Sequence, residues 1–258
     1  MDFIDKEAVW KKAAEPFLVR GDGRQVVLCI HGFQGMPGVF RVLADSLCNS
    51  EGKFDVAAIC LPGHGTKQED MENVNEGDWK GAAIGAFQVL ISSYEKVHII
   101  GFSMGGLLAC ILASMYKDDP RLGKVILASP GFALRMKQFY QIDLEAEKQK
   151  TFTFVPAELS GDGYDLGRPC YNVMSYGNIA CLLRLAKCAM PVLGEITAPV
   201  YAIYSNGDMV ADPDITKECL YEIPTLKETY VLEKSEHNIF IGVDREIAHH
   251  KILEYLNE

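Results

Sequence analysis

The 258-residue sequence predicts an α/β fold, with a mostly parallel sheet of about six strands and helices on both faces. Two observations support this prediction. Short apolar runs rich in β-branched residues alternate with segments of helix length along most of the chain. A Gly-x-Ser-x-Gly pentapeptide, residues 101–105, joins one such run to an apolar segment of helix length. One interval, residues 134–195, breaks the alternation and indicates an insertion.

Six segments have the length and composition of strands. They are residues 25–30, 55–60, 96–100, 124–128, 200–204 and 229–232. Segments of helix length, such as residues 39–49 and 79–94, lie between most of them. Because the first strand begins near Gln25, little room remains for strands before it. Ligands of such sheets bind at the carboxyl ends of the strands, so we expect functional residues in the loops that follow them.

The pentapeptide Gly101-Phe102-Ser103-Met104-Gly105 follows the apolar run at residues 97–100 and precedes another at 107–115. This order is typical of a nucleophile elbow, in which a sharp turn between strand and helix strains the serine backbone. Glycine fits two residues before and after the serine because it has no Cβ. We therefore expect Ser103 at the head of a helix, with its hydroxyl directed into a cleft.

A transmembrane helix is the alternative interpretation of residues 97–116, which contain no Asp, Glu, Lys or Arg. The glycines and Ser103 fall in the middle of this stretch, and its first four residues suit a strand. No second apolar span or flanking basic cluster accompanies it. The sequence therefore favours a buried strand, turn and helix, without a transmembrane segment.

Composition and charge restrict the class of protein. Hydrophobic residues make up 48% of the chain and charged residues 23%, as in a soluble globular protein with a large core. The net charge of −10 repels nucleic acid and anionic lipid, so no nucleic-acid partner is expected. Four of the first seven residues are charged, where a signal peptide requires an apolar core, which predicts a cytoplasmic protein.

The eight cysteines point to the same compartment. They form no Cys-x-x-Cys pair and no Cys/His cluster with zinc spacing, so neither a metal nor a cofactor is predicted. Five of them lie at positions that favour small buried thiols: Cys29, Cys60, Cys110, Cys181 and Cys188.

Residues 134–195 are predicted to form a helical cap inserted into a core made of residues 1–133 and 196–258; the alternative is a connector packed on the surface. The first part of the insertion contains breakers, namely Pro156, Gly161, Gly163, Gly167 and Pro169, and the second part has helical periodicity through Leu182, Leu183, Ala186 and Met190. Its apolar residues either line a tunnel to the site or pack the cap against the body. These residues include Phe152, Phe154, Met174, Leu182 and Met190.

A serine nucleophile requires a base, and the base requires an orienting acid. Asp208 lies in the loop after the predicted strand 200–204, and His237 lies in the loop after strand 229–232. Both loops reach the sheet edge that carries Ser103, so we predict His237 as the base and Asp208 as the acid. The order Ser, Asp, His differs from that of chymotrypsin and subtilisin.

Several other residues compete for these two roles. Asp212 and Asp214 share the loop of Asp208 but lie farther from the end of the strand. His31 is expected to brace a loop, His64 lies in a turn and His98 lies within a strand. His249 and His250 belong to the final helix, where we expect them to be solvated.

The third requirement is a pair of backbone N–H groups that stabilise the oxyanion. Met104 supplies one, since it follows the nucleophile at the start of a helix. Phe33 is expected to supply the other, because His31 and Gly32 precede it directly after the first strand. The nearby glycines do not form Gly-x-Gly-x-x-Gly, so dinucleotide binding has little support.

Together these motifs resemble the α/β-hydrolase superfamily over roughly residues 24–256. They are His31-Gly32-Phe33, Leu61-Pro62-Gly63-His64-Gly65-Thr66, Gly101 to Gly106, Gly207-Asp208 and Ser235-Glu236-His237. Within the superfamily, Gly63-His64-Gly65-Thr66 with Glu69-Asp70-Met71 and Asp78-Trp79 is similar to bacterial monoacylglycerol lipases and related small carboxylesterases.

The resemblance implies a serine esterase with an α/β-hydrolase fold, acting on a small-molecule ester without a cofactor. Ser103, His237 and Asp208 would form its triad, with Phe33 and Met104 as oxyanion donors. Two alternatives remain: a thioesterase or acyltransferase with the same triad, and a non-catalytic ligand-binding member of the fold. The sequence leaves the acyl length, the alcohol group and the oligomeric state open, with a homodimer as one option.

Overall fold

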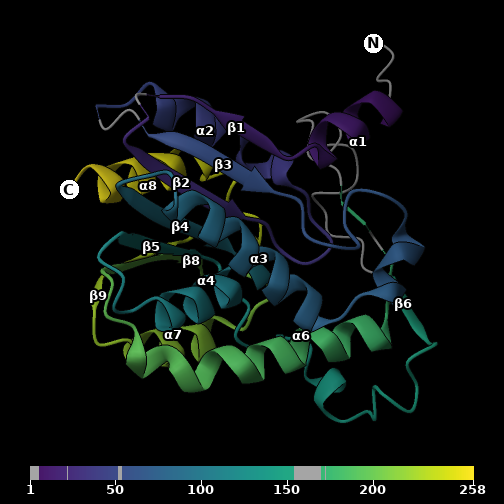
Figure 1. The fold of residues 1–258 in the computed structure, drawn as a ribbon. Coiled ribbons are helices and arrows are strands. Elements are labelled where there is room, and N and C mark those ends of the chain that lie inside the picture. Colours follow the sequence, from purple (N-terminus) through teal and green to yellow (C-terminus); the bar gives the residue numbers. More distant parts are fainter. Residues whose placement is uncertain (1–5, 22, 52–53, 154–169, 172) are drawn as a thin grey trace.

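A seven-stranded sheet forms the centre of the computed structural model, which describes residues 6–21, 23–51, 54–153, 170–171 and 173–258 (Figure 1). The strands lie in the order β1-β3-β2-β4-β5-β8-β9. Their bounds are β1 Phe17–Val19, β2 Gln25–Ile30, β3 Asp55–Ile59, β4 Lys96–Phe102, β5 Leu122–Ala128, β8 Val200–Ser205 and β9 Leu226–Leu232. β1 is antiparallel to β3, and all other neighbouring pairs in this sheet are parallel.

The six predicted strands are confirmed, with small differences at their ends. β1 is the seventh strand, so the prediction of about six was one short. Its three residues are too few to give a strand pattern in the sequence, and it pairs at the edge of the sheet. It extends the sheet without changing the parallel part that carries the candidate site.

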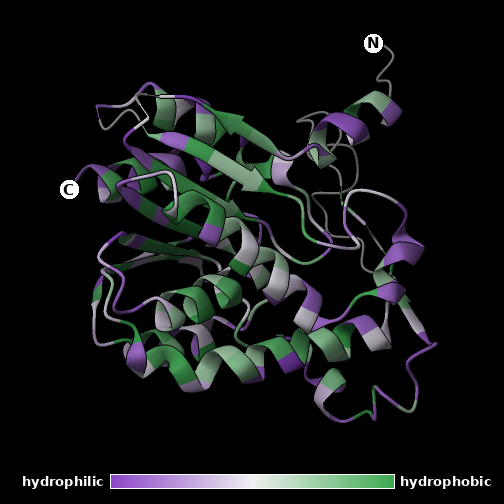
Figure 2. Ribbon diagram, in the orientation of Figure 1, coloured by the Kyte–Doolittle hydropathy of each residue, from purple (hydrophilic) through white to green (hydrophobic). Residues whose placement is uncertain are grey.

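Helices cover both faces of the sheet, as predicted. On one face lie α2 (Arg41–Cys48) and α8 (Arg245–Asn257), and on the other lie α3 (Glu76–Ile91), α4 (Met104–Met115), α6 (Tyr176–Ala189) and α7 (Pro213–Tyr221). α1 (Lys6–Ala14) packs beside the 3₁₀ turn η1 (Pro37–Phe40), and a second 3₁₀ turn, η2 (Gln68–Asn73), precedes α3. In Figure 2 the central strands and α4 are the most uniformly hydrophobic elements.

Strand β2 shows why its sequence is a continuous apolar run. Val26, Leu28 and Ile30 belong to the core on the α3/α4 face, whereas Val27 and Cys29 belong to the core on the α2/α8 face. Successive side chains of a strand point to opposite faces, and here both faces are buried. A strand in this position must be apolar at every residue.

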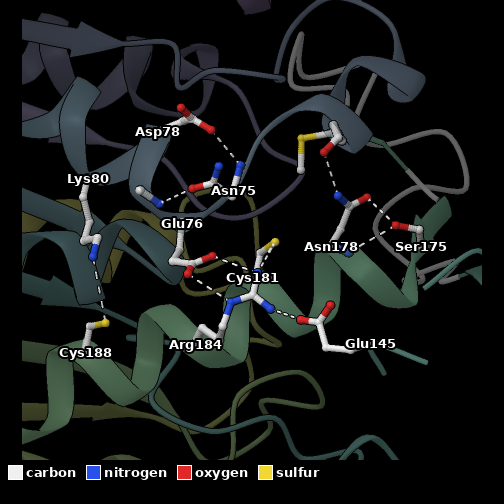
Figure 3. A network of polar contacts seen from close by, with 12 residues as sticks. Asn75, Glu76, Asp78, Lys80, Glu145, Ser175, Asn178, Cys181, Arg184 and Cys188 are labelled. Carbon is white, nitrogen blue, oxygen red and sulfur yellow. Dashed lines mark hydrogen bonds and ion pairs between the residues drawn. The ribbon is translucent and has the colours of Figure 1, made fainter. Parts of the chain in front are cut away.

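Helix α3 begins three residues before the predicted start at Trp79, because a capping box lies there. The Asn75 side chain accepts a hydrogen bond from the Gly77 N–H (2.7 Å), and the Asp78 carboxylate accepts one from the Asn75 N–H (2.9 Å). Reciprocal bonds of this kind satisfy N–H groups that have no partner inside the helix. The cap appears at the upper part of Figure 3.

Residues 134–195 add no strand to the central sheet in the part that the structure describes. They contain the 3₁₀ turn η3 (Lys137–Tyr140), a two-stranded antiparallel sheet of β6 (Thr151–Thr153) and β7 (Val173–Ser175), then α6 and the 3₁₀ turn η5 (Met190–Glu195). Leu182, Leu183 and Ala186 lie in α6, as predicted, and Met190 begins η5. Five predicted breakers and Phe154 lie outside the described residues: Pro156, Gly161, Gly163, Gly167 and Pro169.

Polar side chains fasten α6 to α3 and η2 (Figure 3). The Arg184 guanidinium donates to both carboxylate oxygens of Glu76, at 3.0 and 2.9 Å, and also contacts Glu145. The buried Asn178 side chain donates to the Met71 carbonyl at 2.7 Å. The segment is thereby tied to the body beside the sheet.

The transmembrane interpretation of residues 97–116 is wrong, because these residues are divided between β4 and α4 and are almost wholly buried. In the described part of the chain, one helical stretch has the length and hydropathy of a membrane span, Tyr176–Glu195. Half of its most apolar window is buried inside the protein. Core helices of globular proteins pass the same test, so this stretch is weak evidence for a span.

Two expectations about exposure were wrong. His249 is buried under the sheet, at 4% exposure, whereas His250 is exposed as expected. Cys188 is exposed on α6, where the Lys80 ammonium lies 4.0 Å from its sulfur, and Cys60 is only partly buried, although Cys29, Cys110 and Cys181 are buried as expected. Both differences follow from which helix face meets a neighbouring element.

The turn between β4 and α4 brings two backbone segments unusually close. Ser103 has φ +53° and ψ −115°, a strained conformation for a residue with a Cβ. A Cβ at Gly105 would lie 2.0 Å from the Ile30 carbonyl oxygen, and a Cβ at Gly101 would lie 2.3 Å from the Gly105 oxygen. Only glycine allows α4 to begin against the end of β2.

Three buried histidines accept hydrogen bonds in the body of the protein: His31, His64 and His98. Burial lowers the pKa of His31 to about 3 and the pKa values of His64 and His98 to about 4. Each ring is therefore neutral in the folded protein at neutral pH.

We predict opposite effects of alanine at two glycines. Gly105→Ala should lower the free energy of unfolding by several kcal/mol, because its Cβ overlaps the Ile30 carbonyl and neither backbone can move freely. Gly81→Ala is the matched control, since Gly81 lies exposed inside α3 with no atom near its Cβ position. It should raise stability by about 0.5–1 kcal/mol. Urea unfolding of both variants measures this, and equal effects would contradict the close approach.

The fold should begin to lose stability at pH values well above the pKa of ordinary carboxylates. The unfolded chain binds protons at histidines with a pKa of about 6.5, whereas the folded chain does not until about pH 4 or below. The stabilisation is complete above about pH 6.5 and is lost as the pH falls, at up to about 1.4 kcal/mol per pH unit for each histidine. Urea midpoints measured from about pH 7.5 to about pH 5 should decline, and His98→Gln should reduce the slope. Constant midpoints would contradict burial of neutral histidines.

Candidate active site

Ser103, His237 and Asp208 form a chain of hydrogen bonds at the carboxyl end of the sheet. His237 Nε2 lies 2.8 Å from Ser103 Oγ, and His237 Nδ1 lies 2.7 Å from Asp208 Oδ2. The carboxylate can only accept, so Nδ1 carries the proton and Nε2 is left to accept from the serine hydroxyl. The three residues follow β4, β8 and β9, so the parallel strands bring them to one edge.

The Asp208 carboxylate is held by the backbone as well as by the histidine. Its second oxygen accepts hydrogen bonds from the N–H groups of Val210 and Ala211, both at 2.8 Å. Arg135 donates to the Asp208 carbonyl at 2.7 Å. With only 3% of the side chain exposed, the carboxylate is fixed in direction and shielded from water.

Asp212, the rival for this position, serves a different purpose. Its side chain caps α7 by accepting hydrogen bonds from the N–H groups of Asp214 and Ile215, and it forms an ion pair with Lys137. The hydrogen bond from Lys137 is the main reason that the pKa of Asp212 lies below its usual range. The structure brings Asp208, and neither Asp212 nor Asp214, to His237.

Two residues that the sequence analysis did not identify, Asp244 and Ser205, hold the loop that carries His237. Asp244 accepts hydrogen bonds from the N–H groups of Lys234 and Ser235, and its own N–H donates to Ser235 Oγ at 3.1 Å. The Ser205 hydroxyl contacts the Ser235 carbonyl from the end of β8. The Asp244 bonds span nine or ten residues, and a sequence pattern of neighbouring residues does not reveal such contacts.

Phe33 and Met104, the expected oxyanion donors, flank Ser103. Met104 is the first residue of α4, where N–H groups have no partner within the helix. The loop carrying Phe33 lies against the serine, since a Cβ at Gly32 would be 3.0 Å from the Ser103 Cβ. Among the described residues, neither N–H donates a hydrogen bond to another protein group.

An apolar cavity opens beside Ser103 and His237. Residues from the insertion that line it include Met136, Phe139, Tyr171, Met174, Ile179 and Leu182, and Phe33, Phe102 and Val210 line it from the body. The cavity has few polar groups apart from those of the Ser103–His237 pair and Gln34, Glu236 and Asn238. A cavity with this lining suits an apolar group attached to a small polar reacting centre.

The five apolar residues singled out in the insertion have different positions. Met174 and Leu182 line the cavity. Phe152 packs perpendicular to Phe139, with ring centroids 5.4 Å apart, and Met190 lines a separate surface groove. Phe154 lies outside the described residues. Both interpretations, lining and packing, therefore apply to part of the set.

In the described part of the chain, no group of three His, Cys, Asp or Glu side chains lies close enough together to hold a metal ion.

Comparisons with known proteins agree with this architecture. A family model described as alpha/beta hydrolase fold matches residues 25–166, more than half of the chain. The chain is 28% identical over 253 residues to the thermostable monoacylglycerol lipase of Bacillus sp. (strain H-257), covering 94% of both proteins. It is 23% identical over 248 residues to a carboxylesterase of Bacillus subtilis (strain 168), covering 95% of this chain and 96% of that one.

Solved structures give the same fold. A structure of the metagenome-derived lipolytic enzymes LipS and LipT superposes with a TM-score of 0.84 at 23% identity, covering 95% of this chain and 98% of that one. The match of the family model over the elbow and the first four parallel strands settles the classification. The chain belongs to the alpha/beta hydrolase fold family.

Proposed function

We propose that this protein is a carboxylic ester hydrolase that acts through an acyl-enzyme on Ser103. The observation that carries the proposal is the hydrogen-bonded chain from Ser103 through His237 to Asp208, placed at the mouth of an apolar cavity. The names of the two Bacillus relatives, a monoacylglycerol lipase and a carboxylesterase, support the same reaction.

The first chemical step is attack of the Ser103 oxygen on the ester carbonyl carbon. His237 Nε2 takes the serine proton as the bond forms, and Asp208 stabilises the resulting imidazolium and keeps its orientation. The imidazolium then returns the proton to the alcohol, which leaves. Water repeats the sequence on the acyl-enzyme, and the acid is released with Ser103 restored.

The negative charge of each tetrahedral intermediate is assigned to the N–H groups of Phe33 and Met104. Both groups are near Ser103 and donate to no other protein atom in the described part of the chain. Donors that are already in place stabilise the oxyanion without a reorganisation cost. Acyl transfer by these residues uses no cofactor.

The substrate is proposed to be an uncharged ester with a short to medium acyl chain. The acyl chain would lie along the apolar wall formed by Met174, Ile179 and Leu182. The net charge of −10 disfavours anionic substrates. This assignment treats residues 134–195 as a cap on a core made of residues 1–133 and 196–258, in a cytoplasmic enzyme.

We predict that Ser103→Ala abolishes both activity and covalent labelling. Wild-type protein should react with a fluorophosphonate probe and hydrolyse p-nitrophenyl esters, with turnover greatest for short to medium chains. The variant should lose labelling and about 10⁴-fold or more in kcat, because the nucleophile is gone. Circular dichroism should show an unchanged fold.

Comparison with acyl-thioesters of the same chain lengths separates an esterase from a thioesterase. Faster thioester turnover would replace the esterase assignment, and a wild-type protein that neither labels nor hydrolyses would indicate a ligand-binding protein. Ser103→Ala protein that keeps more than a few per cent of turnover would remove Ser103 as the nucleophile.

The two aspartates of the β8–α7 loop should respond differently to replacement. Asp208→Asn should lower kcat by about 10⁴-fold, because an amide favours the wrong tautomer of His237. Asp212→Asn should leave kcat within a few fold, since Asp212 contacts α7 and Lys137 and the new amide oxygen still caps the helix. Steady-state kinetics on one soluble ester decides the question, and the reverse ranking would transfer the role of acid to Asp212.

A further inference from the structure

The loop that carries Phe33 needs an external constraint. Gln34, the next residue, has φ +62°, a left-handed conformation that is uncommon for a residue with a side chain. One backbone hydrogen bond inside the loop, from the Gly35 N–H to the Gly32 carbonyl, closes the turn. That single bond does not fix the direction of the Phe33 N–H.

His64 supplies a constraint from the loop after β3. Its Nε2 accepts a hydrogen bond from the Gln34 N–H at 3.1 Å, and its Nδ1 lies 3.0 Å from the Pro62 carbonyl. The carbonyl can only accept, so Nδ1 carries the proton and Nε2 is the acceptor. The ring is 3% exposed and lies edge-on to the rings of His31, Phe33 and Trp79.

His31 forms the reciprocal contact. Its Nε2 accepts a hydrogen bond from the Leu61 N–H at 3.0 Å, and its Nδ1 donates to the Gly32 carbonyl at 2.8 Å. Each of the two loops thus presents a histidine that accepts a backbone N–H from the other loop. This cross-bracing fixes the two loops relative to each other as well as to the sheet.

Gln34 also forms hydrogen bonds with the insertion. The Gln34 carbonyl accepts a hydrogen bond from the Tyr171 N–H at 3.1 Å, and the Gln34 side chain donates to the Val173 carbonyl at 2.7 Å. Tyr171 reaches back to the loop of His64, where its hydroxyl accepts from the Thr66 N–H at 3.0 Å. The peptide that begins at Phe33 is therefore held from two sides.

We propose that His64 is a positioning residue for ester hydrolysis, which acts by holding the Gln34 amide so that the Phe33 N–H stays directed at the oxyanion. This inference rests on the proposed function, in which Phe33 is an oxyanion donor. A buried apolar side chain of similar volume would fill the same space, but it would leave the Gln34 N–H without its acceptor. The role predicts a change in kcat that a loss of packing alone does not produce.

The test compares His64→Leu, His64→Gln and His98→Leu in the full-length protein, with kcat and KM for a soluble p-nitrophenyl ester and with thermal unfolding. The glutamine places its amide oxygen near the position of Nε2. His98→Leu is the matched control, because His98 is equally buried and accepts a backbone hydrogen bond from the Lys124 N–H, but lies away from the proposed site.

His64→Leu should lower kcat about 10- to 100-fold with KM changed less than about threefold, because misdirecting an oxyanion donor should reduce kcat somewhat less than deleting it. His64→Gln should recover most of kcat, and His98→Leu should lose stability while kcat stays within about twofold of wild type. Wild-type kcat in His64→Leu, equal losses in the leucine and glutamine variants, or an equal loss in His98→Leu would each overturn the positioning role. Failure of the proposed function would differ, because the wild-type protein would then not hydrolyse the ester at all, or Ser103→Ala would keep wild-type turnover.

Discussion

The close contact between the start of α4 and the end of β2 determines the geometry of the whole candidate site. Gly105 lies where any Cβ would overlap the Ile30 carbonyl, so the helix begins directly against the neighbouring strand. That approach sets the Ser103 backbone in its strained turn and brings it against the loop that follows β2. The nucleophile and both proposed oxyanion donors thus depend on the absence of one side chain.

Packing, rather than ion pairing, accounts for most of the attachment of α6. The Arg184 side chain is 40% exposed in its pair with Glu76, and exposed pairs contribute little to stability. Buried apolar residues of α6, including Ile179 and Leu185, join the core on that face of the sheet, and Asn178 satisfies a buried carbonyl. Burial therefore supplies most of the free energy that holds α6 against the body.

The sequence predicted the parallel sheet and the residues that meet at its edge, because strand length and chain order are local properties. Asp208 and His237 were located by the rule that loops after parallel strands share one edge. Exposure on helices was harder to predict, as His249 and Cys188 show, because it depends on which elements meet. The pairing of β6 with β7, the short strand β1 and the reciprocal contacts of His31 and His64 arise from residues far apart in the chain, which no local pattern describes.

The separation of the proposed triad along the chain has a consequence during synthesis. Ser103 lies in the middle strands of the sheet, whereas the acid and the base follow β8 and β9, which are added at one edge. A growing chain therefore contains Ser103 long before His237, the proposed base, is available to accept the proton. A serine without its base has the reactivity of an ordinary alcohol, so under the proposed mechanism the incomplete chain would not hydrolyse esters. Under the proposed mechanism, hydrolysis would begin only when the last strand of the sheet has docked, so activity would report completion of the fold.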